Sequence, residues 1–211
     1  FATDMNAIVI SNFPVYRSDL ELRRDEYVNR RPSILYLGSV YRISRQEIIL
    51  DIVRGRSDVD YTVFGKVWEE DYRQYLIDKH DFESHFIDGS NRARIPELMK
   101  TSTIGNSIRD FAGSNFPEGS YGVIKIYEYM EAGMPIICSR VEIWEKMMGD
   151  YQCGILVDPN DKTELDKAIS KLVNDRNGAY EMALAGRKAI REKFNWELEF
   201  GKYLEILTSE L

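Results

Sequence analysis

The sequence contains little cysteine and little histidine. Its 211 residues include two of each. Cys138 and Cys153 lie in or beside apolar segments, so we expect buried thiols in a reducing cytoplasm rather than a disulfide. His80 and His85 are too few, and too far from both cysteines, to suggest a metal site. The sequence therefore indicates no metal site, because such sites gather several ligands of these types.

The sequence also lacks a long apolar run. No stretch approaches the roughly 18 residues that a membrane-spanning helix needs. There is no Asn-X-Ser/Thr acceptor for glycosylation and no visible signal peptide. The chain starts at Phe1 without a methionine, so we expect upstream sequence to be missing. We expect a cytoplasmic protein whose membrane contacts, if it makes them, belong to that missing part.

The chain has fewer basic than acidic residues. The chain has 28 Lys and Arg against 35 Asp and Glu, a net charge of −7. This argues against non-specific nucleic-acid binding, where a basic footprint is expected. It leaves open a small anionic ligand, because such a site needs only a few local cations. The hydrophobic content of 44% is ordinary for a globular protein, and a chain of this length can bury a sizeable core.

Short apolar runs alternate with amphipathic stretches along most of the chain. The period-two and apolar runs predict strands at 7–10, 34–37, 61–64, 85–87, 103–108, 135–138 and 154–157. Helical periodicity predicts helices at 45–54, 69–79, 94–100, 123–132 and 142–148. Three further helices are expected after Asp161, which is placed to cap the first of them, with the others at 178–194 and 196–207.

This alternation predicts an α/β fold with a Rossmann-like parallel sheet, helices on both faces and a helical C-terminal tail. We expect a single domain over residues 1–211. The charged stretch 17–31 is expected to be a surface connection between the first two strands. In open sheets of this kind, ligands bind beyond the carboxyl ends of the strands. The loops that follow strands are therefore where functional residues are expected.

The segment GVIKIYEYMEAGMPIICS, residues 122–139, combines a helix start with two charged side chains. If the helix begins near Gly122, the amides of Tyr121, Gly122 and Val123 are free to bind an anion at the positive end of the helix dipole. Lys125 can reach the same anion. Glu128 lies one turn further, where a carboxylate can accept two hydrogen bonds from a ribose diol. The alternative is that Lys125 and Glu128 form a surface ion pair.

A second cluster, GSVYRISRQEI at residues 38–48, follows the expected strand 34–37. Gly38 ends that strand, and Arg42 and Arg45 flank the turn into the next helix. Guanidinium groups there suit a diphosphate, although both arginines could equally be solvated. The loop 88–94, DGSNRAR, is turn-like and is placed to line a base pocket. We find no G-x-G-x-x-G fingerprint, P-loop or nucleophile elbow.

Taken in order, these segments resemble the C-terminal half of a two-domain (GT-B fold) glycosyltransferase of the family 4, or group 1, type. The most specific match is KIYEYMEAGMPIICS, which resembles the family segment K-x-x-E-Y-M-x-A-G-x-P. ILYLGSVYRISRQEIILDIV resembles the unit that opens the domain, and GILVDPNDKTELDKAISKLVND resembles its closing part. NAIVISNFP resembles the segment that links the two halves. The likeness covers nearly the whole chain.

The resemblance implies roles for individual residues. Glu128 would hold the ribose of a nucleotide-sugar donor. Lys125, the amides around Tyr121–Val123 and one of Arg42 and Arg45 would meet the diphosphate. Two positions depart from the family: Ser39 replaces the usual arginine after Gly38, and Ser120 replaces the first Glu of the Glu-x7-Glu pattern. The first carboxylate commonly contacts the donor sugar.

The resemblance also implies the function. The chain would be the donor-binding part of an enzyme that transfers a hexose-type sugar to a polysaccharide, a glycolipid or a similar acceptor. The nucleotide sugar, UDP-linked or otherwise, would be a substrate, with no cofactor. The acceptor site would lie in a missing N-terminal domain, so this fragment alone would be inactive and its catalytic residues stay unassigned. The alternatives are a nucleotide-sugar epimerase of the same fold and a non-catalytic nucleotide-sugar-binding domain.

Overall fold

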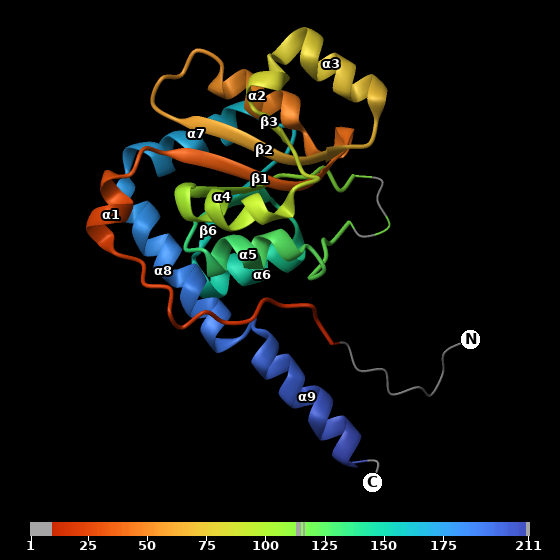
Figure 1. Cartoon of the computed structure of the whole chain (residues 1–211), viewed down its shortest axis with the longest axis vertical. Coiled ribbons are helices and arrows are strands. Elements are labelled where there is room, and N and C mark those ends of the chain that lie inside the picture. Colours follow the sequence, from red (N-terminus) through yellow and green to blue (C-terminus); the bar gives the residue numbers. More distant parts are fainter. Residues whose placement is uncertain (1–9, 113–114, 116, 210–211) are drawn as a thin grey trace.

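The computed structural model describes residues 10–112, 115 and 117–209. Within them, six parallel strands form one sheet in the order β3-β2-β1-β4-β5-β6 (Figure 1). The strands are β1 (Ser33–Val40), β2 (Asp60–Val67), β3 (Phe86–Asp88), β4 (Ile104–Ser107), β5 (Ile136–Ser139) and β6 (Gly154–Val157). This confirms the predicted Rossmann-like fold, with strand ends shifted by a few residues. The expected strand 7–10 lies outside the described residues except for Ile10.

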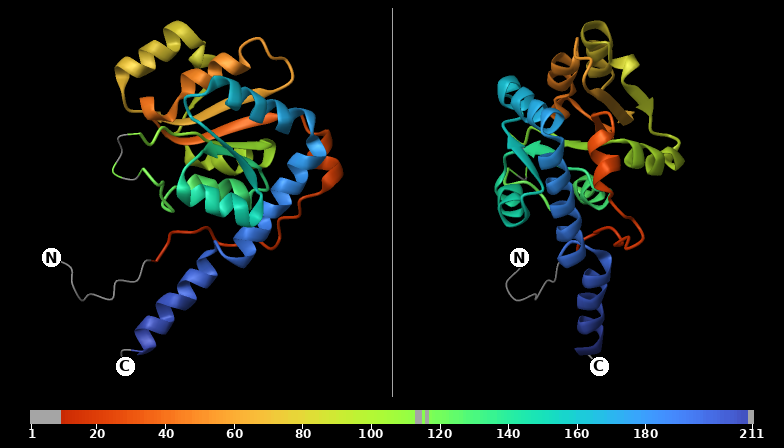
Figure 2. Two further views of the ribbon diagram at one scale, coloured as in Figure 1. Left: turned by 180° about the vertical axis from the view of Figure 1, so that it is seen from behind. Right: turned by 90° about the vertical axis from the view of Figure 1, so that its left-hand side faces the viewer.

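Helices connect the strands and cover both faces of the sheet (Figure 2). They are α1 (Arg24–Asn29), α2 (Gln46–Val53), α3 (Glu70–His80), α4 (Ile95–Thr101), α5 (Ile124–Glu131), α6 (Glu142–Tyr151), α7 (Lys162–Asn174), α8 (Arg176–Glu192) and α9 (Trp196–Ser209). The predicted cap of α7 is confirmed, because the Asp161 carboxylate accepts the amides of Thr163 and Glu164 at 2.9 and 3.0 Å.

The central strand β1 shows why its sequence is an unbroken apolar run. Ile34 and Tyr36 belong to a buried cluster with α2, α3 and α7, whereas Leu35 and Leu37 belong to a second cluster with α5 and α6. Successive side chains of a strand point to opposite faces, so a strand covered on both sides must be apolar at every position. The alternation fixes the register of β1 against both layers.

The expectation that residues 17–31 form only a surface connection was wrong in one part. Six of them form α1, and Tyr27 within it is fully buried. The Tyr27 hydroxyl donates to the carbonyl of Thr103 at 2.9 Å, and the Arg176 guanidinium lies 4.8 Å from the ring centroid. Two adjacent apolar residues, Tyr27 and Val28, give no helical period, so this element depends on contacts that are remote in sequence.

The last helix, α9, extends away from the rest of the chain in the views of Figures 1 and 2. Six of its large apolar side chains are more than a third exposed: Trp196, Leu198, Phe200, Tyr203, Leu204 and Leu207. The thiols of Cys138 and Cys153 are free and buried, as predicted, and burial raises the pKa of Cys153 to about 12. No described helix is long and apolar enough to cross a membrane.

Candidate functional site

The chain reverses its direction of winding between β1 and β4, and a cleft of about 620 Å³ opens there at the carboxyl ends of the strands. Gly38, Gly65 and Gly89, at the ends of three neighbouring strands, form part of its lining. A Cβ atom on Gly65 would lie 1.8 Å from the Gly38 carbonyl oxygen, and one on Gly89 would lie 2.8 Å from the Gly65 Cα. Only glycine allows these backbones to pack so closely, which leaves an open floor for a ligand.

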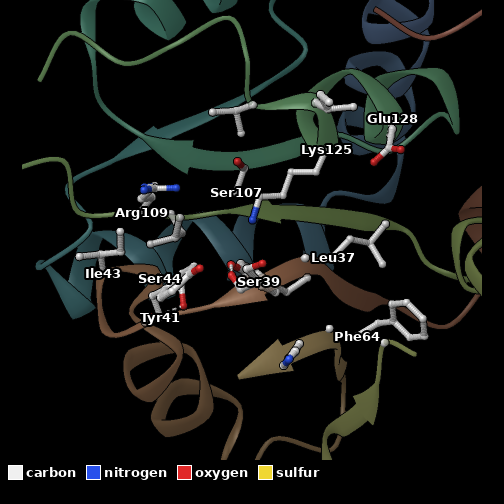
Figure 3. A pocket seen from close by; sticks show the side chains of 18 of the residues that line it. Leu37, Ser39, Tyr41, Ile43, Ser44, Phe64, Ser107, Arg109, Lys125 and Glu128 are labelled. Atoms are coloured by element: carbon white, nitrogen blue, oxygen red, sulfur yellow. Dashed lines mark hydrogen bonds between the residues drawn. The ribbon is translucent and has the colours of Figure 1, made fainter. Parts of the chain in front are cut away.

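Helix α5 brings Lys125 and Glu128 to the wall of this cleft (Figure 3). The helix starts at Ile124 rather than near Gly122. The Gly122 amide, expected to be free, donates to the Ser120 hydroxyl at 3.0 Å. Of the three amides expected to meet an anion, those of Tyr121 and Val123 make no hydrogen bond with a described residue.

Lys125 is half-buried and supported by an aromatic ring. Its Nζ lies 3.7 Å from the centroid of Tyr36, which fixes the ammonium by a cation–π contact. Tyr36 is in turn held by its hydroxyl, which donates to the Ser39 carbonyl at 2.7 Å. Lys125 makes no ion pair with any described residue, Glu128 included. The surface ion pair considered as the alternative is therefore absent, and the ammonium remains available to a ligand.

Glu128 is also half-buried, and its carboxylate makes no hydrogen bond or ion pair with the described part of the chain. Burial raises the pKa of this carboxyl, and the charges of Arg92 and Lys125 offset part of that effect. A carboxylate kept in a cleft without partners can accept two hydrogen bonds from a vicinal diol. This is the chemistry that a ribose requires.

The structure brings five of the nine predicted site residues together. Gly38, Gly122, Val123, Lys125 and Glu128 line the cleft. The other four, Arg42, Arg45, Ser120 and Tyr121, do not line it. Ser120 accepts a hydrogen bond from the Gly122 amide, and Tyr121 is 42% exposed.

The two arginines after β1 already have carboxylate partners. Arg42 donates to Asp71 at 2.8 Å and lies over the Tyr72 ring. Arg45 donates to Asp110 at 2.7 Å from a left-handed backbone with φ of 50°. Both partners come from later segments of the chain, so a motif around Gly38 could not reveal them. The diphosphate role of either arginine stays a prediction that this geometry does not support.

Two cleft cations, Lys66 and Arg109, were not predicted from the sequence, and a third, Arg92, belongs to the loop 88–94 that we expected to line a base pocket. Each follows a predicted strand, so the rule that ligands bind at carboxyl ends could have found them. With Lys125 they place four cations in a cleft whose only lining acid, among the residues described, is Glu128. The cleft is thus locally positive in a chain of net charge −7, which favours an anionic ligand.

Within residues 10–112, 115 and 117–209 no group of three or more His, Cys, Asp or Glu side chains is placed to hold a metal ion. A glycine-floored, cationic cleft at the switch point of a parallel sheet is typical of α/β folds of the Rossmann type. A family model described as glycosyl transferases group 1 matches residues 21–189. The chain therefore belongs to the group 1 glycosyltransferase family.

Relatives agree with this assignment. The chain is 34% identical over 132 residues to the O-antigen chain mannosyltransferase B of Escherichia coli, a match that covers 62% of this chain and 32% of the relative. The fold resembles that of Anabaena HepE, solved with UDP and glucose, with a TM-score of 0.70 at 18% identity over 89% of this chain and 51% of that one.

A third comparison concerns a domain solved by itself. The C-terminal domain of the group 1 family protein LpcC from Francisella tularensis superposes with a TM-score of 0.62 at 15% identity. That match covers 87% of this chain and 96% of the solved domain. By contrast, this chain spans only about a third of the mannosyltransferase and half of HepE. The chain thus has the fold of the C-terminal half of a GT-B glycosyltransferase.

Proposed function

We propose that this chain is the donor-binding part of a glycosyltransferase that moves a hexose-type sugar from a nucleoside diphosphate to a polysaccharide, glycolipid or similar acceptor. One observation carries the proposal. Lys125 and Glu128 stand half-buried and without ion-pair partners among the described residues, three positions apart on one wall of a glycine-floored cleft. A cation followed by a lone carboxylate complements a phosphate followed by a ribose.

In this function the chain holds the donor and stabilises the departing diphosphate. Lys125 meets the phosphates, and its charge favours the negative charge that grows there as the sugar leaves. Glu128 accepts hydrogen bonds from the ribose hydroxyls and fixes the nucleotide along the cleft. The acceptor site belongs to the rest of the protein, and closure of that part over the cleft would exclude water. This chain alone is expected to bind nucleotide without turnover.

The relatives support the class of substrate. The E. coli relative is named for mannosyl transfer to an O-antigen chain, and the HepE structure contains UDP and glucose. The free, buried thiols of Cys138 and Cys153 suit a reducing cytoplasm. The apolar side chains exposed along α9 suit a contact with another part of the same protein. We propose the N-terminal half as that part.

Calorimetric titration of this chain with UDP, GDP, ADP and CMP, and with the matching nucleosides, tests the proposal. We expect at least one diphosphate to bind, with an affinity that falls as ionic strength rises and that is far weaker for its nucleoside. Equal binding of nucleoside and diphosphate would remove Lys125 from its role. Incubating the full-length protein with nucleotide sugars then separates transfer from epimerisation and from simple binding.

A further inference from the structure

The end of β1 and the turn that follows it offer the cleft hydroxyl groups instead of cations. The arginines of the turn, Arg42 and Arg45, are paired with Asp71 and Asp110 and do not line the cleft. Ser39 and Ser44 line it instead. The charge that the far end of a diphosphate needs must therefore come from another element.

Arg109 is placed to supply that charge. It follows β4 and lines both the cleft and an adjoining hollow of about 350 Å³. Its amide donates to the buried Ser139 hydroxyl at 2.8 Å, and that hydroxyl donates back to the Arg109 carbonyl at 2.6 Å. The backbone of Arg109 is thus tied to the end of β5 at both polar atoms. Its guanidinium lies 5.5 Å from the centroid of Phe111 and makes no ion pair with a described residue.

The acidic residue next to Arg109 in the sequence does not neutralise it. Asp110, the next residue, accepts hydrogen bonds from Arg45 at 2.7 Å, from Asn160 at 3.2 Å and from the Ala112 amide at 2.9 Å. These bonds hold the pKa of Asp110 below its usual range, against the effect of burial, so it stays a carboxylate paired with Arg45. Arg45 therefore does not contact the ligand itself. It pairs with Asp110, so that this carboxylate does not pair with Arg109.

The order of side chains along the cleft assigns Arg109 its partner. From one end to the other, Figure 3 shows Glu128, Lys125, Ser107 and Arg109. A nucleotide whose ribose lies at Glu128 has its first phosphate near Lys125 and its second phosphate further toward Arg109. Building on the function proposed above, we propose that Arg109 binds the second phosphate of the diphosphate, the one that leaves with the negative charge when the sugar is transferred.

The test compares nucleoside diphosphates with monophosphates. Dissociation constants for GDP, GMP, UDP and UMP are measured by calorimetry for the wild-type chain, Arg109→Gln, Arg109→Lys and Arg42→Gln. For the diphosphate that binds the wild type, Arg109→Gln should lower affinity by about tenfold to a hundredfold, because a hydrogen bond to a charged group is lost. Its monophosphate should lose less than about threefold. Arg109→Lys should recover part of the loss, and the matched control Arg42→Gln should change neither ligand.

Two results would overturn the assignment of Arg109. Arg109→Gln could preserve the wild-type ratio of the two affinities, either by changing neither or by weakening both equally, or Arg42→Gln could collapse the ratio in its place. Each of these leaves the proposed donor site intact, because the wild type still binds nucleotide. If the wild type binds none of the diphosphates UDP, GDP and ADP, both the site and this inference fail. Unchanged melting temperatures confirm that the variants fold, as expected for two exposed side chains.

Discussion

Two glutamates on α5 are three residues apart and have opposite surroundings. Glu128 lines the cleft, half-buried, with no partner among the described residues. Glu131 is 6% exposed; it accepts the Arg17 amide at 2.8 Å and lies 3.8 Å from the Arg187 guanidinium. Arg187 also donates to the carbonyls of Glu131 and Arg17, at 2.6 and 2.9 Å. One carboxylate joins three segments of the chain, and the other joins none.

This difference distinguishes a carboxylate that stabilises the fold, Glu131, from one that we propose binds a ligand, Glu128. Burial raises the pKa of both carboxyls, so burial alone cannot distinguish them. Their interaction partners do distinguish them. Glu131 interacts with a backbone amide and a guanidinium, whereas Glu128, among the described residues, is affected only by the charges of Arg92 and Lys125. A half-buried carboxylate without hydrogen bonds lowers stability, and proteins keep such groups where a ligand completes them. The same contrast holds between Arg42, which is paired with Asp71, and Arg109, which has no ion pair with any described residue.

The largest expected effect is on stability, at Glu131. Glu131→Ala leaves the buried Arg187 without its counter-charge, which costs about 3–5 kcal/mol. For a chain of this size each kcal/mol lowers the melting temperature by about 2–4 °C. Thermal and urea unfolding measure the loss. Nucleotide affinity should stay within about twofold of wild type, because Glu131 lies away from the cleft.

Glu128→Ala is the matched control on the same helix. It removes a carboxylate that has no partner to lose, so its free energy of unfolding should stay within about 1 kcal/mol of wild type. If the two alanine variants unfold at the same temperature, the distinction between a structural and a functional carboxylate is wrong.

The next effect is on binding, at Glu128. Glu128→Gln keeps the shape but removes the charge and leaves one acceptor oxygen. A hydrogen bond to a charged group contributes roughly 1.5–3 kcal/mol, so nucleotide affinity should fall by about tenfold to a hundredfold. Calorimetric titration with a nucleoside diphosphate measures this loss of affinity. A 2′-deoxy nucleotide should lose a comparable factor with the wild type and little more with the variant. Wild-type affinity in Glu128→Gln would disprove the ribose role.

The sheet and helix α5, which carries Lys125 and Glu128, could be predicted from the sequence because both depend on local patterns. Buried parallel strands must be continuous apolar runs, which is why β1 was recognisable. The rule that ligands bind at the carboxyl ends of strands then placed Gly38, Lys125 and Glu128 in one cleft. These predictions needed only chain order and periodicity.

The pairing of charges could not be predicted in the same way. Arg42 and Arg45 meet Asp71 and Asp110, which follow 29 and 65 residues later. In the sequence, an arginine near a glycine turn looks the same whether or not a distant carboxylate forms an ion pair with it. Arg109 was overlooked for the converse reason: no motif marks it, and only the fold shows that it has no acidic partner among the described residues.

The smallest effect is a pH dependence with opposite signs for stability and for binding. Burial raises the pKa of Glu128 above its ordinary 4.5. The folded protein therefore binds a proton there at pH values where the unfolded chain does not, so this group increases stability as pH falls from above the raised pKa to 4.5. Over the same window nucleotide affinity should fall, because a protonated carboxyl loses acceptor capacity for the ribose diol.

The comparison with Glu128→Gln isolates this effect, since Glu131 and every other group titrate alike in both proteins. Phosphate protonation, with a second pKa of about 6, also weakens binding at low pH, but it does so equally for wild type and variant. The difference in melting temperature should favour Glu128→Gln at neutral pH and shrink on acidification. The ratio of nucleotide affinities should shrink with it, as the protonated wild type comes to match the amide. If both quantities change in parallel for the two proteins across this window, Glu128 does not titrate in the cleft, and its carboxylate is not the group that holds the ribose.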